Sequence, residues 1–242
     1  MSPLAVAEAE PAPRPHTDFD AIADEYDDSL PRHVVEHYLR KRLAFIQAWT
    51  RPCPTLDLGC GTGVLAERVA AAGYDVVALD PSRGMLAQLR RRQPGIRTIA
   101  GSGQALPFAD DTFGLTYCVA VMHHVAESDS VRATLTEMAR VTRPGGHILV
   151  WDHNPRNPYW PLLMRRVPQD TGAERLIPEA EIVMGLRAGG AMPIHAAQLG
   201  FMPDFTPPPL VGAVARLERL AERGPGVRRF CAHNVVLAVK PG

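Results

Sequence analysis

Short apolar runs alternate with amphipathic segments through the middle of the chain. The runs at 55–59, 75–80, 96–100, 114–121 and 147–152 are typical of buried strands. Segments with apolar residues at helical spacing lie between them, at 64–73, 82–93 and 129–142. This alternation predicts an α/β fold with a doubly wound, mostly parallel sheet and helices on both faces.

The flanking segments follow different patterns. Helical spacing through 18–30 and 32–49 predicts two N-terminal helices, split near Pro31. After the fifth predicted strand, "HNPRNPYWP" is too rich in proline for regular structure, whereas 178–190 predicts a helix with a glycine stop. The stretch 228–241 contains a closing strand, which we expect at or near the sheet edge. Residues 153–178 and 202–227 therefore look like elaborations of a finished core.

The domain organisation follows from these patterns and from composition. Residues 1–16 are dominated by Pro, Ala and Glu, and we interpret them as a disordered tail. We expect one domain over 17–242, because 242 residues suit one substantial core better than two. Its predicted parts are helices at 17–50, a core at 51–152, an elaboration at 153–228 and a closing strand at 229–242.

Composition narrows the functional classes. The 26 Lys and Arg balance the 26 Asp and Glu, which argues against a nucleic-acid partner because neutralising phosphates drives that affinity. No apolar run approaches the ~20 residues that span a bilayer, and the N-terminus does not resemble a signal peptide. We therefore expect a cytoplasmic protein without a membrane partner. The cysteines suggest neither a zinc site nor a disulfide framework, because they have no paired close spacing: Cys53, Cys60, Cys118 and Cys231.

A glycine-rich loop, "DLGCGTG" (57–63), follows the first predicted strand. Loops at the carboxyl ends of parallel strands bind ligands in open α/β sheets. Glycines at 59, 61 and 63 exceed the needs of a tight turn and let the backbone approach a ligand closely. The dinucleotide fingerprint G-x-G-x-x-G needs its third glycine where Val64 stands. Asp80, at the end of the second strand, suits the hydroxyls of a ribose, so a nucleoside ligand is predicted.

Asp57 decides between nucleoside ligands. An acid here repels a pyrophosphate but suits a ligand with an ammonium group and a sulfonium centre. With "DLGCGTG", "ALDPS" (78–82), "GQALPFADDTFGLTYCVAVMHHV" (103–125) and "RVTRPGGHILV" (140–150), the chain resembles the class I S-adenosylmethionine-dependent methyltransferases over 19–152. The resemblance, to the type 11 group that acts on small molecules, implies a seven-stranded Rossmann-like fold, S-adenosyl-L-methionine as cofactor, and 51–152 as its binding core.

The resemblance also implies roles for single residues. Gly59, Gly61 and the backbone of Cys60 would line the methionine part, and Asp57 would orient its ammonium end. Asp80 would hold the ribose, and Met85 would pack against the adenine. Tyr26 matches a tyrosine that closes over the methionine carboxylate in relatives, although an aromatic of an amphipathic helix also packs in a core. The residues assigned to the cofactor are Tyr26, Asp57, Gly59, Cys60, Gly61, Asp80, Pro81, Met85, Ser102, Gly103, Gln104, Cys118 and His123.

The adenine segment departs from the pattern of the relatives. They usually read G-D-A, with the acid accepting from the adenine amino group, whereas "GSGQALPF" (101–108) has Ser102 in that place. A serine hydroxyl still accepts one hydrogen bond but is shorter and uncharged. Ser102, Gln104 and a water molecule remain open as partners of the amino group.

Methyl transfer from a sulfonium needs alignment and exclusion of water, and it requires no metal. A histidine suits the role of general base if the nucleophile is a hydroxyl or a protonated amine. His124 ends the fourth predicted strand and His153 the fifth, and we expect either as the base. A structural role for each remains open.

The segment "NPYWPLLMRRVPQDTGAERL" (157–176) is expected to form a lid and the acceptor pocket, within the acceptor-side elaboration at 153–228. Tyr159 and Trp160 offer aromatic surface, and Arg165 and Arg166 suit a carboxylate or phosphate. Alternatively, the aromatics only pack the lid and the arginines face water. The stretch "HNPRNP" resembles enzymes of secondary metabolism, including antibiotic biosynthesis, and of sugar modification.

The function predicted from these features is methyl transfer to a small molecule, at oxygen more readily than at nitrogen or carbon, by a monomer or homodimer. Methylation of a macromolecule such as tRNA is an alternative that the neutral charge disfavours. A cofactor-binding regulator or a non-methylating enzyme is another, because fold does not fix function. A dinucleotide oxidoreductase is disfavoured by Asp57 and Val64.

Overall fold

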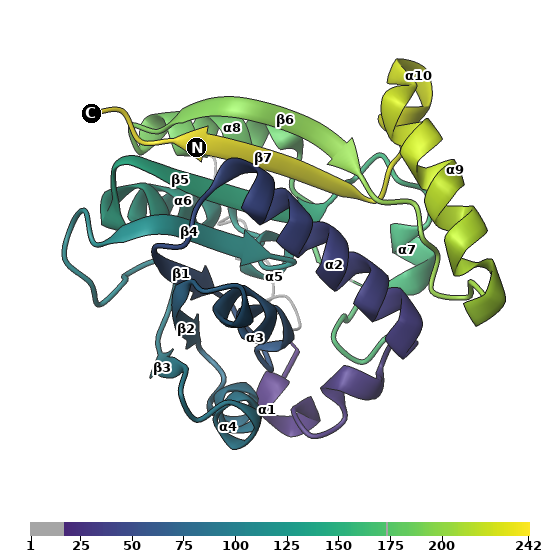
Figure 1. Ribbon diagram of the computed structural model, residues 1–242, viewed down its shortest axis with the longest axis horizontal. Coiled ribbons are helices and arrows are strands. Elements are labelled where there is room, and N and C mark those ends of the chain that lie inside the picture. The colour runs from purple at the N-terminus through teal and green to yellow at the C-terminus, as the bar shows by residue number, and fades with distance from the viewer. Residues whose placement is uncertain (1–16, 173) are drawn as a thin grey trace, which may run out of the picture.

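The computed structural model of the chain describes residues 17–172 and 174–242 (Figure 1). The predicted disordered tail at 1–16 lies outside the described residues. Seven strands form one sheet in the order β3-β2-β1-β4-β5-β7-β6. The strands are β1 (Pro54–Leu58), β2 (Asp75–Asp80), β3 (Arg97–Ala100), β4 (Phe113–Val119), β5 (Thr142–His153), β6 (Met192–Leu199) and β7 (His233–Val239).

The sheet is mostly parallel, as predicted. Strands β1 to β5 pair in parallel, and only β7 runs antiparallel to its neighbours β5 and β6. The strand order reverses between β1 and β4, and the carboxyl ends of β1 to β5 meet at one edge. Open α/β sheets bind ligands at such a switch point. The predicted fold class is therefore confirmed.

Helices cover both faces of the sheet, with α2 and α3 in front and α6 and α8 behind in Figure 1. Alternate residues of a strand point to opposite faces. Val77 and Leu79 of β2 accordingly pack in the core under α6 and α8, and Val76 packs in the core under α2 and α3. The helices of these two layers are α2 (Arg32–Trp49), α3 (Val64–Ala71), α4 (Arg83–Arg92), α5 (Met122–Val125), α6 (Ser128–Val141) and α8 (Glu179–Ala188).

The N-terminal segment differs from its prediction. Instead of one helix over 18–30, it forms the short α1 (Phe19–Ile22) and a 3-10 turn, η1 (Tyr26–Asp28). Its acids bind other elements: Asp20 accepts from Ser82 Oγ at 2.6 Å, and Asp27 accepts from Thr62 Oγ1 at 2.6 Å. These tertiary hydrogen bonds replace helical continuity and place the segment over the glycine-rich loop.

The chain after β5 completes the sheet and adds small helices. Strand β6 is an edge strand that the sequence pattern did not indicate, and β7 lies between it and β5. In "MPIHAAQL" apolar and polar residues alternate only weakly, and only Ala197 is buried. The sequence pattern therefore did not predict β6. The other elements are α7 (Trp160–Leu163), η2 (Pro208–Leu210), α9 (Val211–Arg223) and α10 (Pro225–Arg228). Across the described part of the chain, none of the helices combines the length and apolarity that a membrane span requires.

Candidate functional site

The glycine-rich loop leaves β1 in a left-handed conformation and is fastened to β2. Gly59 (φ +70°) donates to Leu79 O at 2.7 Å, and Gly61 (φ +54°) donates to Asp80 Oδ2 at 2.8 Å. A Cβ on Gly59 would lie 2.4 Å from Val121 Cγ2, so this position needs glycine for packing. A Cβ on Gly61 would meet no atom within 4 Å, because this backbone faces open space.

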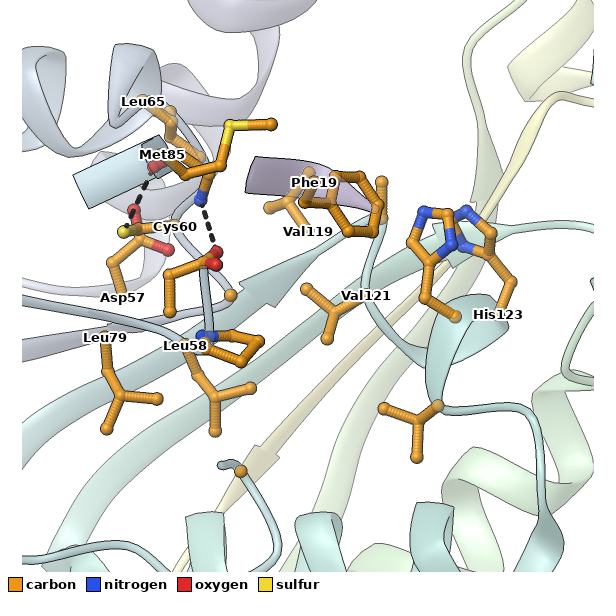
Figure 2. Close-up of a pocket in the computed structure, with 18 of the residues that line it drawn as sticks. Phe19, Asp57, Leu58, Cys60, Leu65, Leu79, Met85, Val119, Val121 and His123 are labelled. Carbon is orange, nitrogen blue, oxygen red and sulfur yellow. Dashed lines mark hydrogen bonds between the residues drawn. The ribbon is translucent and has the colours of Figure 1, made fainter. Parts of the chain in front are cut away.

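That open space belongs to a cavity of about 430 Å³ at the carboxyl ends of β1, β2 and β4 (Figure 2). Its size is that of a small-molecule site. Cys118 is not on its wall but is buried in the core behind β4. The other residues assigned to the cofactor all line the cavity: Tyr26, Asp57, Gly59, Cys60, Gly61, Asp80, Pro81, Met85, Ser102, Gly103, Gln104 and His123.

Three carboxylates line this cavity, and two of them, Asp57 and Asp80, lie at the carboxyl ends of β1 and β2. Burial raises the pKa of Asp57 to about 7, although its Oδ2 accepts a hydrogen bond from the Tyr117 hydroxyl at 2.8 Å. Burial also raises the pKa of Asp80, and amide donation from Ser82 and Gly61 counters part of that rise. A bound cation would stabilise the charged form of Asp57, so this wall suits an ammonium or sulfonium group.

Arg42 is a site residue that the sequence reasoning missed. It is the one arginine or lysine among the described residues that line the first cavity. Its Nε is buried without a hydrogen-bond partner, and burial lowers the pKa of the guanidinium to about 10. The run "LRKRL" (39–43) looks like a solvated helix face, and no local signal separates Arg42 from its neighbours. A cation on the wall of a cavity is suited to an anionic ligand group.

A second cavity, of about 550 Å³, adjoins the first. His153, Tyr159 and Trp160 line it, whereas Arg165 and Arg166 lie on the wall of neither cavity. Both arginines are exposed, and Arg166 donates to the Tyr159 hydroxyl at 2.7 Å. The wall residues that the two cavities share are Tyr26, Leu39, Arg42, Val64, Ala120, His123 and His124.

His123 is held between two carboxylates. Its Nδ1 lies 2.9 Å from Asp152 Oδ1, and its Nε2 lies 3.6 Å from Asp170 Oδ1. Burial alone lowers the pKa of His123, but the two carboxylates outweigh it and raise the pKa to about 9. His123 is therefore a cation at neutral pH and cannot accept a proton there.

The two histidines predicted as bases occupy different places. His153 stacks on Trp160, with ring centroids 3.6 Å apart, and lines only the second cavity. Burial, followed by the charge of His123, lowers its pKa well below the usual range, so it is neutral. His124 lies on both walls, packs edge-on against Phe19 and has its Nε2 3.8 Å from Asp170 Oδ1. His124 thus lies where a group entering from either cavity can reach it.

Two sets of potential metal ligands occur in this cluster. The donor atoms of each set lie within 4.8 Å of one another. Each set includes His123, which would have to lose its proton and its present pairing before it could ligate a metal. The sets are His123, His124 and Asp170, and His123, Asp152 and His153.

Comparison with known proteins decides the family. A family profile described as a methyltransferase domain matches residues 56–150. A demethylmenaquinone methyltransferase of Renibacterium salmoninarum is 34% identical over 181 residues, which are 68% of this chain and 75% of the relative. The chain belongs to the class I S-adenosylmethionine-dependent methyltransferases. The methyltransferase is accordingly an enzyme whose cofactor is S-adenosyl-L-methionine and whose acceptor is a small molecule.

Further relatives agree with this family. A demethylmenaquinone methyltransferase of Paenarthrobacter aurescens is 36% identical over 165 residues, covering 62% of this methyltransferase and 64% of the relative. A Thermotoga maritima structure, described as an S-adenosylmethionine-dependent methyltransferase and possible histamine N-methyltransferase, superposes with a TM-score of 0.68. The superposition covers 92% of this chain and 97% of the Thermotoga maritima chain. Because the two sequences are only 19% identical, this similarity supports the fold alone.

Substitution of Gly61 should affect both ligand binding and the stability of the fold. Gly61→Ala is expected to weaken binding of S-adenosylhomocysteine about tenfold, because its Cβ enters the space of the first cavity. The left-handed backbone should also cost about 1–2 kcal/mol of stability. Calorimetry and thermal unfolding measure the two effects.

Gly145→Ala is the matched control for this substitution. Gly145 also has a left-handed φ, of +72°, and open surroundings, but it lies near the amino end of β5, at the opposite edge of the sheet. It should cost similar stability and leave affinity unchanged. Equal affinities of the two variants would show that Gly61 does not face the ligand.

Proposed function

We propose that this methyltransferase methylates an apolar, ring-bearing hydroxy compound of the hydroquinone or phenol class. The observation that carries the proposal is the second cavity, whose wall joins aromatic and aliphatic side chains to the histidine cluster beside the first cavity. The relatives named demethylmenaquinone methyltransferases support a quinone-type ring in the acceptor. They give no support to oxygen as the acceptor atom, because menaquinone carries its added methyl group on a ring carbon. Their names give no support to secondary metabolism, antibiotic biosynthesis or sugar modification, which the short "HNPRNP" stretch suggests.

The residues of the first cavity fit the cofactor, which supplies an electrophilic methyl group. Gly61 leaves open space beside the loop, and Arg42, on the cavity wall, suits the methionine carboxylate. Asp57 suits the ammonium group. Asp80 accepts hydrogen bonds from two backbone amides and still has lone pairs that can accept from the ribose hydroxyls. Ser102 and Gln104 both line the cavity, so both remain candidates for the adenine amino group.

The second cavity is the proposed acceptor site. Tyr159, Trp160 and Leu163 form part of its wall, from the segment that we expect to exclude water from the transfer. A flat aromatic acceptor can stack on such a wall and bury its apolar surface.

His124 is the proposed general base. His123 already carries a proton, and His153 lies only on the wall of the second cavity. His124 lies where the cavities meet, so an acceptor hydroxyl beside the methyl group is within its reach. Asp170 lies near its Nε2 and would stabilise the imidazolium that forms. Deprotonation raises the nucleophilicity of the hydroxyl oxygen, which is the proposed methyl acceptor atom.

The test is methyl transfer from labelled S-adenosylmethionine to a panel of acceptors. Turnover is expected with 1,4-naphthoquinol and catechol, and none with glucose or histamine. His124→Gln should lower kcat about 100-fold at neutral pH, with a loss that shrinks as rising pH ionises the acceptor. His147→Gln, a change on β5 outside both cavity walls, is the control.

Three outcomes would contradict parts of this proposal. Turnover of glucose or histamine in preference to the phenolic acceptors would reject the acceptor class. Methylation of a ring carbon would reject the oxygen as acceptor atom. Full activity of His124→Gln at neutral pH would reject the base.

A further inference from the structure

Helix α9 packs with its two carboxylates inward. Glu218 is its one buried residue, 1% exposed. It accepts from Lys41 Nζ and from the Phe201 amide, each at 2.6 Å, and lies 3.0 Å from His37 Nε2. Glu222 also pairs with Lys41 and accepts from the Gly200 amide at 2.7 Å. Carboxylates, rather than leucines, therefore attach α9 to the body of the protein.

The two leucines of α9, Leu217 and Leu220, consequently face outward. Leu210, Ala213, Leu217 and Leu220 recur at intervals of three and four residues, so they share one face of the helix. Leu217 is 57% exposed and Leu220 62% exposed, whereas a helix of a globular protein normally buries such a stripe. Helices α9 and α10 lie at the right-hand edge of Figure 1, beyond the ends of the strands, so no sheet covers them.

More exposed apolar residues surround this helix. Phe201 donates its own backbone amide to Glu218, and Phe230 precedes β7. Phe205 is 69% exposed and packs beside Tyr159, with ring centroids 5.8 Å apart. We name this set the α9 surface; its apolar members are Phe201, Phe205, Leu210, Leu217, Leu220 and Phe230.

The charge on the α9 surface has one sign. Arg216, Arg219 and Arg223 form a second row beside the leucines, and Arg229 lies over the ring of Phe230. Within the described residues, no ion pair involves any of these four arginines. The carboxylates between 201 and 230 are Asp204, which lies 3.9 Å from the Arg166 guanidinium, and Glu218 and Glu222, which pair with Lys41. The exposed charge of this surface is therefore positive.

The α9 surface borders the mouth of the second cavity. Phe201 and Asp204 line that cavity, and Asn157 on the same wall donates to Phe230 O at 2.7 Å. A surface that contacts the α9 residues would therefore lie next to the proposed acceptor site.

We propose that the α9 surface docks on an anionic lipid membrane. Leucine and phenylalanine side chains beside a row of arginines are the composition of helices that lie in the membrane interface. Each arginine near an anionic surface adds about 1 kcal/mol of attraction. This proposal differs from the expectation, drawn from the composition of the sequence, that the protein has no membrane partner. Membrane docking is independent of the proposed function, because binding to vesicles can be measured without any methyl transfer.

The test is cosedimentation of the full chain with vesicles. Vesicles of phosphatidylcholine with about 30% phosphatidylglycerol should bind the protein, and pure phosphatidylcholine vesicles should not. Arg216→Gln/Arg219→Gln should weaken binding about 20-fold and reduce its salt dependence. Leu217→Ser/Leu220→Ser should weaken binding about tenfold or more through lost apolar burial. Both doublets alter exposed side chains, so unfolding temperatures should not change.

Matched controls lie elsewhere on the molecule. Arg90→Gln/Arg97→Gln removes two exposed arginines near β3, and Met184→Ser/Met192→Ser removes two exposed apolar side chains near β6. Both should bind vesicles like the unmodified protein. Equal loss in the controls, or equal binding to both vesicle types, would overturn the proposal. It would also be overturned by a dimer that Leu217→Ser/Leu220→Ser dissociates, with no vesicle binding, because the surface would then join two copies of the chain.

Discussion

Replacing Arg42 with methionine is expected to weaken binding of S-adenosylhomocysteine about 30- to 150-fold, which corresponds to about 2–3 kcal/mol. The guanidinium lines the first cavity with a buried Nε that has no partner. A carboxylate of the ligand gives it a charge-assisted hydrogen bond at low local dielectric. Methionine removes the cost of a buried guanidinium but also its contacts over the Tyr38 and Trp151 rings, so the stability of the fold should change little.

A ligand without the carboxylate separates this role from general damage to the cavity. Affinity for 5′-methylthioadenosine, which lacks the amino-acid part, should be the same in Arg42→Met and in the unmodified protein when measured by calorimetry. Arg40→Met, on the exposed side of the same helix, is the control and should bind both ligands normally. Equal loss for both ligands in Arg42→Met would show that Arg42 shapes the cavity and does not bind the carboxylate.

Replacing Asp152 with asparagine is expected to destabilise the fold by about 3–5 kcal/mol, because removing one partner of a buried pair leaves the other charge uncompensated. Asp152 is fully buried at the end of β5. It accepts from the amides of Met122 at 2.6 Å and His153 at 2.7 Å, and it pairs with His123. In asparagine an NH₂ group replaces one of the two carboxylate oxygens. This group cannot accept the hydrogen bonds that the backbone amides donate to Asp152.

The size of this loss should depend on pH. The pKa of His123 in the folded protein, about 9, lies above the value of about 6.5 for an unperturbed histidine. Its pairing therefore stabilises the fold fully below about pH 6.5, and this contribution is lost as pH rises through about 9. Burial alone would raise the pKa of Asp152, but His123 and the amide donors lower it, so its contribution is lost only in acid.

Thermal unfolding at about pH 6 and about pH 9.5 measures this dependence. The difference in Tm between Asp152→Asn and the unmodified protein should be larger at the lower pH. Asp129→Asn, which removes a carboxylate from an exposed pair with Arg132, should change Tm little at either pH. A Tm difference that does not vary with pH would show that His123 is neutral in the folded protein.

Local sequence patterns were sufficient where local physics decides the structure. Helix α2 and strand β2 have the predicted bounds, because helical spacing and a short apolar run each have one compact solution. The loop at 59–63 was predictable because its left-handed backbone requires glycine, and its position after β1 places it at the ligand-binding edge. The residues assigned to the cofactor lie on the wall of the first cavity, apart from Cys118, which faces the core.

The remaining features depend on contacts between distant segments. Arg42 has the same local sequence signal as its charged neighbours, and only the packing of α2 against Trp151 of β5 brings it to the cavities. The charge of His123 depends on Asp152 and Asp170, which folding brings beside it from β5 and from the segment after α7. Helix α9 has a regular apolar stripe, which normally predicts a buried face. Ion pairs of Glu218 and Glu222 with Lys41 turn that stripe outward, and an interaction with a partner 177 residues away in the sequence leaves no trace in local spacing.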